Sequence, residues 1–544
     1  MTLDVDRGVT AGGASEQAQA ANGADVVSFF RGRSVLVTGA TGFMGKVLVE
    51  KLLRACSDID TVYAVVRTKR GKSPADRMAE YVSSQAFDRL RQEGLAAQLD
   101  KIVAVSGDVS AAGLGLSGDD AALLAARVSV VFHCAANVRF DLSLADAVNL
   151  NTVGTRNVLN YASTIDRLDA FIHVSTAYCH CDEDTLEERT YLGDVNPEKV
   201  IDMCQWMDPA ALKDITPKLI GSLPNTYAYS KGLSEHLVSS YSERMPIGIA
   251  RPSIVMPSWQ EPMPGWVDNL NGPSGLLVGA AKGVVRSMHC KEHYLADLMP
   301  VDIVINAIIA LAWKVGRTRP TKPLVVNMCE SGDNPVTWGG MLEMCKKESR
   351  VTPSQGAVWY PDGSIKDSHW QHTLCVVFFH FLPAYLIDFL MLVSGNRRFM
   401  VQLQRRIQGG LKILHYYTTR KWVFRNERLK GLAAELSPQD RKRFPMDVRA
   451  VDWPTYFHNY VSGVRNFVLH EDPDVSKAVR HHQRLYVLHR VTVVAFYALV
   501  AWLLWTLVSG LSGALSGALS VGGNPTLSRW LGYSVSSIGI TSPL

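Results

Sequence analysis

A tyrosine, a lysine and a serine near the middle of the chain have types and spacing suited to reduction of a carbonyl group. Tyr227 and Lys231 lie four residues apart, so a helix would place both side chains on one face. A phenol, with an ordinary pKa near 10, becomes a readier proton donor when a neighbouring ammonium stabilises its phenolate. Ser175, with Thr176 as the alternative, follows the run FIHV and would hydrogen-bond the substrate oxygen. Alone, the pair also occurs by chance on exposed helices, so its meaning depends on context.

A glycine-rich turn near the start of the chain supplies that context. The run SVLV leads directly into TGATGFMG at residues 38–45, and the helix-forming stretch KVLVEKLLRAC follows. In this motif the first glycine permits a tight turn, the second lets the backbone approach a pyrophosphate, and the third lets helix and strand pack closely. It predicts a dinucleotide site, with a purely structural turn as the alternative. The expected contacts are Gly39, Thr41, Gly42, Phe43, Met44 and Gly45.

The ends of the following strands bear on which dinucleotide binds. The second strand runs into Arg67, followed by Lys69 and Arg70, where NAD-binding proteins usually carry a carboxylate. Cations there favour a 2′-phosphate and hence NADPH, with Arg67 as the expected contact and plain surface charge as the alternative. Asp108 is expected at the adenine amino group. The other expected contacts are Val109, Ala135, Ala136, Asn137, Pro252, Ser253 and, on the nicotinamide side, Tyr227 and Lys231.

A parallel sheet must position these residues. Apolar, β-branched runs at 34–38, 61–66, 101–108, 128–135, 171–178 and 247–255 alternate with helix-length segments. Continuous apolar strands separated by helices indicate a sheet covered on both faces. At 544 residues the chain exceeds the roughly 250–300 residues of a single core, so at least two domains are expected. We predict a disordered arm over 1–28 and a doubly wound α/β Rossmann domain with a substrate subdomain over 29–350.

Two segments beyond that domain are strongly apolar. Residues 372–395 carry Pro383 and Asp388, which argue against a straight span and favour a buried or interfacial helix pair in a mainly helical, membrane-associated domain over 351–475. Residues 491–508 are uncharged and long enough for a membrane helix, so a transmembrane or anchoring segment is predicted over 491–523, with a flexible glycine-rich tail as the alternative for its second half. Four basic residues precede the segment between 477 and 490, which places the catalytic body in the cytosol.

The distribution of charge and the spacing of the cysteines limit the kinds of ligand and partner that the chain is expected to bind. The net charge is only +5, but residues 397–450 hold fourteen Lys or Arg against four Asp or Glu, which suits anionic lipid or a solvated helical face. The segment has no nucleic-acid reading motif, so no nucleic acid is expected. Nine cysteines without metal or redox spacing predict neither a metal site nor a disulfide framework. The endoplasmic reticulum is the expected membrane, with the peroxisomal membrane as the alternative.

Longer stretches resemble the alcohol-forming fatty acyl-CoA reductases, within the extended short-chain dehydrogenase/reductase superfamily. They include EPMPGWVDNLNGP at 261–273, DLMPVDIVINA at 297–307 and HYYTTRKWVF at 415–424, and the segment 447–472 is similar to the C-terminal helical domain of that family. The resemblance covers residues 29–472. It implies two hydride transfers from NADPH that reduce a long-chain fatty acyl-CoA through an aldehyde to the alcohol, with release of coenzyme A.

The resemblance also implies roles for particular residues. Tyr227 would be the proton donor, Lys231 its partner, Ser175 or Thr176 the oxyanion ligand, and Asn151 a member of the proton relay. Substrate contacts are expected at Trp266, Asp268, Asn269 and Asn271. The chain departs from the family pattern at Met256 and Pro257, where small residues are usual, so the shape of the substrate pocket is not predicted.

Two alternatives remain beside this interpretation. Another extended reductase, acting on a sterol or a nucleotide sugar, would share the glycine turn and the Tyr227–Lys231 pair but would not explain the run GWVDNLNGP. A non-catalytic, nucleotide-sensing scaffold at a membrane would not need an intact serine, tyrosine and lysine. Assembly into a homo-oligomer is left open.

Overall fold

The structure is a computed structural model that describes residues 25–67, 71 and 74–521. It divides into two compact units, the first ending at Val475 and the second beginning at Ser476. Residues 1–24 of the predicted arm lie outside the described residues. The last residues of that arm form helix α2 (Val26–Phe30), in which Val26 is fully buried, so the folded unit begins before the predicted boundary at residue 29.

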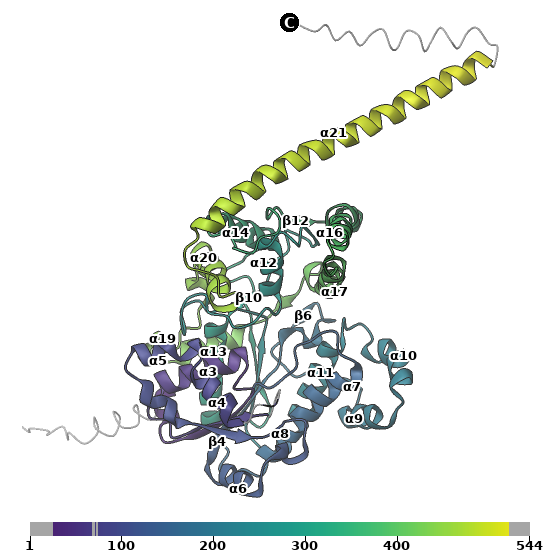
Figure 1. The fold of residues 1–544 in the computed structure, drawn as a ribbon. Coiled ribbons are helices and arrows are strands. Elements are labelled where there is room, and N and C mark those ends of the chain that lie inside the picture. The colour runs from purple at the N-terminus through teal and green to yellow at the C-terminus, as the bar shows by residue number, and fades with distance from the viewer. Residues whose placement is uncertain (1–24, 68–70, 72–73, 522–544) are drawn as a thin grey trace, which may run out of the picture. The chain divides into compact units, whose positions relative to one another are not determined.

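A seven-stranded parallel sheet forms the centre of the first unit (Figure 1), in the order β11-β7-β5-β4-β1-β2-β3. In register, Val37 of β1 pairs with Ala64 of β2 and Phe132 of β4. The order reverses at β1, which is where ligands bind in such sheets, beyond the carboxyl ends of the strands. The strands are β1 (Ser34–Thr38), β2 (Val62–Val66), β3 (Ile102–Ser106), β4 (Val128–His133), β5 (Ala170–Val174), β7 (Ile247–Pro252) and β11 (Leu324–Met328).

Helices cover both faces of the sheet, which confirms the predicted doubly wound fold. Figure 1 shows α3 (Phe43–Ala55) and α13 (Val301–Thr318) on one side, and α8 (Gly154–Ala162) and α11 (Thr226–Ser240) on the other. Two apolar cores result: Val35 and Val37 of β1 face the first and Leu36 faces the second, as the alternation of a strand requires.

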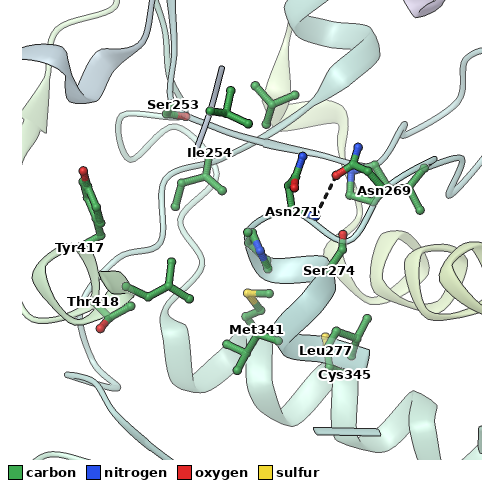
Figure 2. A pocket seen from close by; sticks show the side chains of 18 of the residues that line it. Ser253, Ile254, Asn269, Asn271, Ser274, Leu277, Met341, Cys345, Tyr417 and Thr418 are labelled. Atoms are coloured by element: carbon green, nitrogen blue, oxygen red, sulfur yellow. Dashed lines mark hydrogen bonds between the residues drawn. The ribbon is translucent and has the colours of Figure 1, made fainter. Parts of the chain in front are cut away.

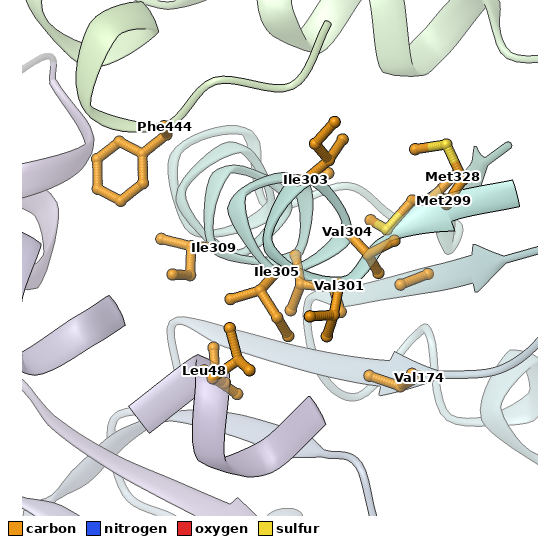
Figure 3. Packing of buried hydrophobic residues seen from close by; sticks show 14 of the residues in the cluster. Leu48, Val174, Met299, Val301, Ile303, Val304, Ile305, Ile309, Met328 and Phe444 are labelled. Atoms are coloured by element: carbon orange, nitrogen blue, oxygen red, sulfur yellow. The ribbon is translucent and has the colours of Figure 1, made fainter. Parts of the chain in front are cut away.

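The C-terminal region completes the first core. Figure 3 shows α13 packed between Leu48 of α3, Val174 of β5 and Phe444, which follows α19 (Pro438–Arg443). Helix α18 (Glu427–Glu435) also packs on α13, and α20 (Trp453–Gly463) on α14 (Trp338–Val351). The region 351–475 therefore belongs to the same compact unit as the sheet.

The remaining elements surround this body. Helices α4 (Pro74–Val82), α5 (Asp88–Gln92), α6 (Gly118–Arg127), α7 (Leu144–Ala147), α9 (Pro197–Trp206) and α10 (Pro209–Ile220) follow the early strands. Helix α12 (Pro273–Ala281) packs against α14. Short parallel pairs join β8 (Ile254–Met256) to β10 (Leu298–Pro300), β9 (Ser287–His289) to β12 (Ser364–Lys366), and β6 (Thr185–Leu186) to β13 (Val423–Phe424).

The apolar segment after residue 368 is one continuous helical rod. It comprises α15 (His369–Cys375), a π-helical turn (Val376–Phe381) and α16 (Leu382–Val393), and α17 (Met400–Thr418) packs against it. Pro383 stands at the start of α16, directly after the π-helical turn, and its missing N–H removes one hydrogen bond from the helical ladder at that junction. The predicted helix pair is present, but it is not buried, because only 17% of the apolar window lies inside the protein.

The second unit consists, within the described residues, of helix α21 (Ser476–Val521). Its residues 476–513 and the rod 369–393 are both long and apolar enough to cross a membrane, by length and composition. Residues 522 and 523, the end of the predicted membrane segment, lie outside the described residues.

Candidate active site

A cavity of about 660 Å³ opens at the carboxyl ends of the central strands. It begins at the glycine turn after β1, passes the residues that follow β4 and β5, and continues between α12, α14 and α17. Figure 2 shows its far part, with side chains from strand, loop and three helices converging. The labelled residues are Ser253, Ile254, Asn269, Asn271, Ser274, Leu277, Met341, Cys345, Tyr417 and Thr418.

The glycine turn has the shape of a pyrophosphate cradle. Gly39 adopts a φ of +75°, and a Cβ there would lie 2.7 Å from the backbone nitrogen of Ala135. A Cβ at Gly45 would lie 2.2 Å from the carbonyl oxygen of Gly39. Gly42 caps α3 without a side-chain hydrogen bond, so the first N–H groups of the helix remain for an anionic ligand. These observations fit a dinucleotide phosphate.

Cations gather beside this turn. The half-exposed Arg67 directs Nη1 to within 3.7 Å of Oδ2 of Asp108. Arg77 of α4 donates to the carbonyl oxygen of Arg67 and lies 3.4 Å from Oγ1 of Thr41. Sequence reasoning missed Arg77 because its place beside the turn depends on how α4 packs. Lys69 and Arg70 lie outside the described residues.

Asp108 is already held locally, since its carboxylate accepts bonds from the backbone nitrogen of Ser110 at 3.0 Å and from its hydroxyl at 2.8 Å. Among the described residues, several expected cofactor contacts do not line the cavity, whereas the others do. Those outside the lining are Thr41, Arg67, Asp108, Val109, Ala135, Asn137 and Lys231.

The serine and tyrosine meet at the cavity. Ser175 and Thr176 follow β5, Tyr227 stands in the first turn of α11, and all three line the cavity wall. The backbone nitrogen of Ser175 donates to Ala250 at 2.7 Å, and its hydroxyl to the sulfur of Cys179 at 3.6 Å. Burial raises the pKa of the Tyr227 phenol above its usual value.

Lys231 lies one helical turn further on, beneath β5. Its Nζ donates to the carbonyl oxygen of Val174 at 2.8 Å and lies 3.5 Å from Nε2 of His173. Burial lowers the pKa of the Lys231 amine to about 8. The amine therefore remains mostly a cation at neutral pH.

Asn151 links two parts of the site. It lies in a π-helical turn (Val148–Val153), a distortion often found at functional sites. Its Oδ1 accepts from the backbone nitrogen of Asn137 at 2.8 Å, and its Nδ2 donates to the carbonyl of Asn137 at 3.2 Å and to Oγ of Ser230 at 3.0 Å. Asn151 thereby ties the loop after β4 to the helix that carries Tyr227 and Lys231.

Behind Asn151 lies a histidine that sequence reasoning did not single out. Nδ1 of His133 is 2.7 Å from Oγ1 of Thr38, and Nε2 is 3.0 Å from Oγ1 of Thr155, which in turn donates to the carbonyl of Asn151 at 2.7 Å. Burial lowers the pKa of His133 to about 3, so the ring is neutral. This chain of bonds joins the end of β1 to the π-helical turn.

A buried ion pair supports the loop that carries Ser175. Arg251 donates to both oxygens of Glu235, from Nε at 2.8 Å and from Nη2 at 2.5 Å, and the thiol of Cys179 donates to the same carboxylate at 3.2 Å. Burial alone would raise the pKa of Glu235, but Arg251 and His180 outweigh it and hold that pKa well below its usual range. Cys179, His180 and Glu235 stand close enough to share a metal ion, but the guanidinium of Arg251 already occupies the carboxylate.

The expected substrate residues separate into two groups. Asp268, Asn269 and Asn271 line the cavity, and Oδ1 of Asn269 accepts from the backbone nitrogen of Asn271 at 2.9 Å (Figure 2). Asp268 also forms an ion pair with Lys46 of α3 at 2.9 Å. Trp266 does not line the cavity: it is buried and stacks on Phe43 at 5.4 Å between ring centroids, so it packs the wall.

The far part of the cavity is mostly apolar and is built by α12, α14 and α17. Leu277 of α12 and Met341 and Cys345 of α14 form one wall (Figure 2). Tyr417 of α17 lines the cavity as Tyr227 does, and its hydroxyl accepts a hydrogen bond from Nδ2 of Asn225 at 2.9 Å. The walls of the cavity are therefore formed by segments that lie far apart in the sequence.

The fold and the site together define a nicotinamide-dependent oxidoreductase of the short-chain dehydrogenase type. Two family models described as male sterility protein, one of them for NAD binding, match residues 37–308 and 379–471. Fatty acyl-CoA reductase 1 of Xenopus laevis is 42% identical over 460 residues, which cover 84% of this chain and 88% of that protein. The human fatty acyl-CoA reductase 1 is 39% identical over 457 residues, with the same coverage. Fatty acyl-CoA reductase 2 of Bos taurus is 39% identical over 479 residues, or 88% of this chain and 92% of that protein.

The chain belongs to the fatty acyl-CoA reductase family, which confirms the resemblance found in the sequence. Among solved structures, the reductase domain of a non-ribosomal peptide synthetase from Mycobacterium tuberculosis superposes with a TM-score of 0.54 at 21% identity. That alignment covers 83% of this chain and 95% of the domain, and it supports the fold.

Proposed function

We propose that this protein reduces a long-chain fatty acyl-CoA to the fatty alcohol with NADPH, through an aldehyde and with release of coenzyme A. One observation carries the proposal: a single cavity joins the glycine turn, the side chains of Ser175 and Tyr227, and an apolar chamber between α12, α14 and α17. A cofactor, a carbonyl and a long acyl chain thus have adjoining places. The relatives described above are fatty acyl-CoA reductases by name, which agrees with this substrate class.

In this proposal the protein's own groups act on the carbonyl oxygen. Bound NADPH supplies the hydride for each of the two reductions. Ser175 or Thr176 donates a hydrogen bond to the oxygen as negative charge develops on it, and Tyr227 delivers the proton. Lys231 stabilises the phenolate left on Tyr227, and Asn151 holds the helix and the neighbouring loop in register. The first reduction also expels the thiol of coenzyme A, and the second converts the aldehyde into the alcohol.

The preference for NADPH rests on cations beside the glycine turn. Arg77 lies beside Thr41 of the glycine turn and donates to the carbonyl oxygen of Arg67, and both guanidinium groups would be available to the 2′-phosphate of NADPH. Arg67 faces Asp108 only at 3.7 Å and is half-exposed, so it can turn toward a phosphate at little cost.

The apolar chamber accounts for a fatty substrate. Each buried methylene contributes about 0.8 kcal/mol, so an acyl chain that fills the chamber gains several kcal/mol over a short one. Helix α21 supplies a membrane anchor by its length and hydropathy. The basic residues that precede its apolar part favour a catalytic body on the cytosolic side, with the endoplasmic reticulum as the proposed membrane and the peroxisomal membrane as the alternative.

The test is anaerobic incubation of the detergent-solubilised chain with NADPH and a ladder of saturated acyl-CoAs, with alcohol, aldehyde and free coenzyme A quantified. We expect two NADPH consumed per alcohol, and loss of turnover in Tyr227→Phe while NADPH binding persists. NADH in place of NADPH tests the cofactor preference. NADPH binding without turnover of any acyl-CoA would refute the thioester substrate.

A further inference from the structure

The helical rod formed by α15, the π-helical turn and α16, together with the returning helix α17, makes a hairpin over residues 369–418, which we call the apolar hairpin. The side chains on its outer surface are large and apolar, and no part of the described first unit covers them. Six of them are between 55% and 74% exposed: Trp370, Leu382, Leu386, Phe389, Leu390 and Val393. A contiguous apolar surface of this kind marks an interaction site.

The only acidic residue of the apolar hairpin is turned away from this surface. Asp388 is 7% exposed, and its carboxylate accepts bonds from the backbone nitrogens of Phe399 at 3.0 Å, Met400 at 2.9 Å and Val401 at 3.0 Å. These N–H groups begin α17 and would otherwise lack partners. The carboxylate therefore fixes the turn of the hairpin and leaves the outer face of α16 without charge.

The turn and the second helix of the hairpin are basic. Arg397 and Arg398 are exposed in the turn, and Arg405, Arg406 and Lys412 are exposed along α17. Five cations against one buried carboxylate give the hairpin a strong positive excess. An apolar face bordered by arginines is the pattern of a helix that lies in a membrane interface, with its cations at anionic headgroups.

We propose that the apolar hairpin is a second membrane contact, inserted in the plane of one leaflet of an anionic bilayer and separate from the anchor α21. A spanning arrangement is disfavoured by α17, because Leu414, Tyr417 and Thr418 at its end line the substrate cavity. If α16 crossed the bilayer, α17 would have to return through it with Arg405 and Arg406 in the hydrocarbon, where charges are costly.

This contact brings the bilayer to the wall of the cavity. Val285 and Ser287 line the cavity, whereas Arg286 between them lies over the ring of Phe379 in the hairpin at 5.4 Å. The backbone nitrogen of Arg286 also donates to Nε2 of His380 at 3.0 Å. If the substrate is the fatty acyl-CoA of the proposed function, its acyl chain would reach the cavity from the membrane, where it is dissolved.

The first test is photolabelling of the full chain in nanodiscs that contain anionic phospholipid and a phospholipid with a diazirine in its acyl chain. Digestion and mass spectrometry are expected to find adducts on Leu386, Phe389 and Leu390 as well as on α21. Trp206 of α9, which is 73% exposed, is the matched control and should stay unlabelled. Adducts confined to α21 would overturn the proposal.

The second test separates insertion in the plane from a span. Asn396→Cys, in the turn of the hairpin, and Lys199→Cys, in α9, are treated with a membrane-impermeant maleimide in sealed vesicles, with the unmodified chain as background. Labelling of both from the same side is expected. Labelling from opposite sides would establish a span and refute the proposal.

A third measurement connects the contact to turnover. Leu386→Gln with Phe389→Gln should raise KM for a long-chain acyl-CoA in nanodiscs severalfold while leaving kcat, and KM in detergent, unchanged. An equal KM in nanodiscs for the variant and the unmodified chain would contradict a role in substrate delivery. The photolabelling does not require turnover, so its outcome is independent of whether acyl-CoA is the substrate.

Discussion

The surroundings of Lys231 predict a loss of activity between pH 7 and pH 9. Its amine is buried beneath β5, and burial lowers its pKa to about 8. An amine with that pKa is about 90% protonated at pH 7 and about 10% protonated at pH 9. In the proposed mechanism only the ammonium form stabilises the phenolate of Tyr227, so activity should be full below the pKa and be lost as the pH rises through it. We expect kcat/KM to fall about tenfold over these two pH units.

The assay should follow reduction of a long-chain aldehyde rather than the thioester, because thioesters hydrolyse in alkali. Initial rates at subsaturating aldehyde are measured from pH 6 to pH 10 in a mixed buffer of constant ionic strength, with circular dichroism at each pH to confirm that the fold persists. Lys231→Arg is the control, since its guanidinium stays charged throughout, and any residual activity should not decline across this range. A descending limb centred above pH 10, as for an exposed lysine, would refute this reasoning, and so would a matching decline in Lys231→Arg.

Three further predictions concern the cofactor and the acyl chain. Gly45→Ala should abolish NADPH binding in a fluorescence titration, because its Cβ would lie 2.2 Å from a backbone oxygen of the same turn; unchanged binding would mean that the turn does not hold the phosphates. Arg67→Ala should raise KM for NADPH about tenfold and leave KM for NADH unchanged, whereas equal effects on both would point away from a 2′-phosphate contact. Cys345→Phe, on the wall of the chamber, should shift the preferred acyl-CoA to shorter chains, with about a fourfold loss in kcat/KM for each methylene displaced; an unaltered ladder in a variant with an unchanged melting temperature would mean that the acyl chain does not reach α14.

The elements of the fold that could be predicted are those whose sequence pattern lies within one short segment of the chain. Six strands were recognised because each is a continuous apolar run between helix-length segments, and these runs form six of the seven strands of the sheet. The seventh, β11, was missed. Its run is short and contains Asn327, whose buried side chain donates to the carbonyls of Leu186 at 3.1 Å and Arg425 at 2.8 Å. A polar residue looks unfavourable in a buried strand until its partners, 141 and 98 residues away in the sequence, are known.

The same division applies to the site. The glycine turn and the Tyr227–Lys231 pair are local patterns, and their spacing along the chain is enough to predict their geometry. The structure forms the turn and the helix at those positions. Arg77 and Cys345 carried no signal, because each reaches the site from a helix whose position depends on the whole fold. Tyr417 lies in a run that carried the family resemblance, but that resemblance assigned it no role in the site. Trp266 stands within a specific run and is predicted as a substrate contact, and in the structure its ring packs against Phe43 outside the lining of the cavity.

Asp388 shows why a charge in an apolar segment is ambiguous in sequence. A carboxylate facing lipid is costly, so its presence argued against a straight lipid-exposed span and for a buried or interfacial helix pair. In the structure three backbone N–H groups at the start of α17 donate to the carboxylate. Only one position of the rod, on its inner side, is therefore occupied by a charged residue. The remaining positions stay apolar and exposed. A charged residue therefore keeps lipid away only from the helix face on which its side chain lies. In this chain the packing of the following helix, α17, determines which face that is.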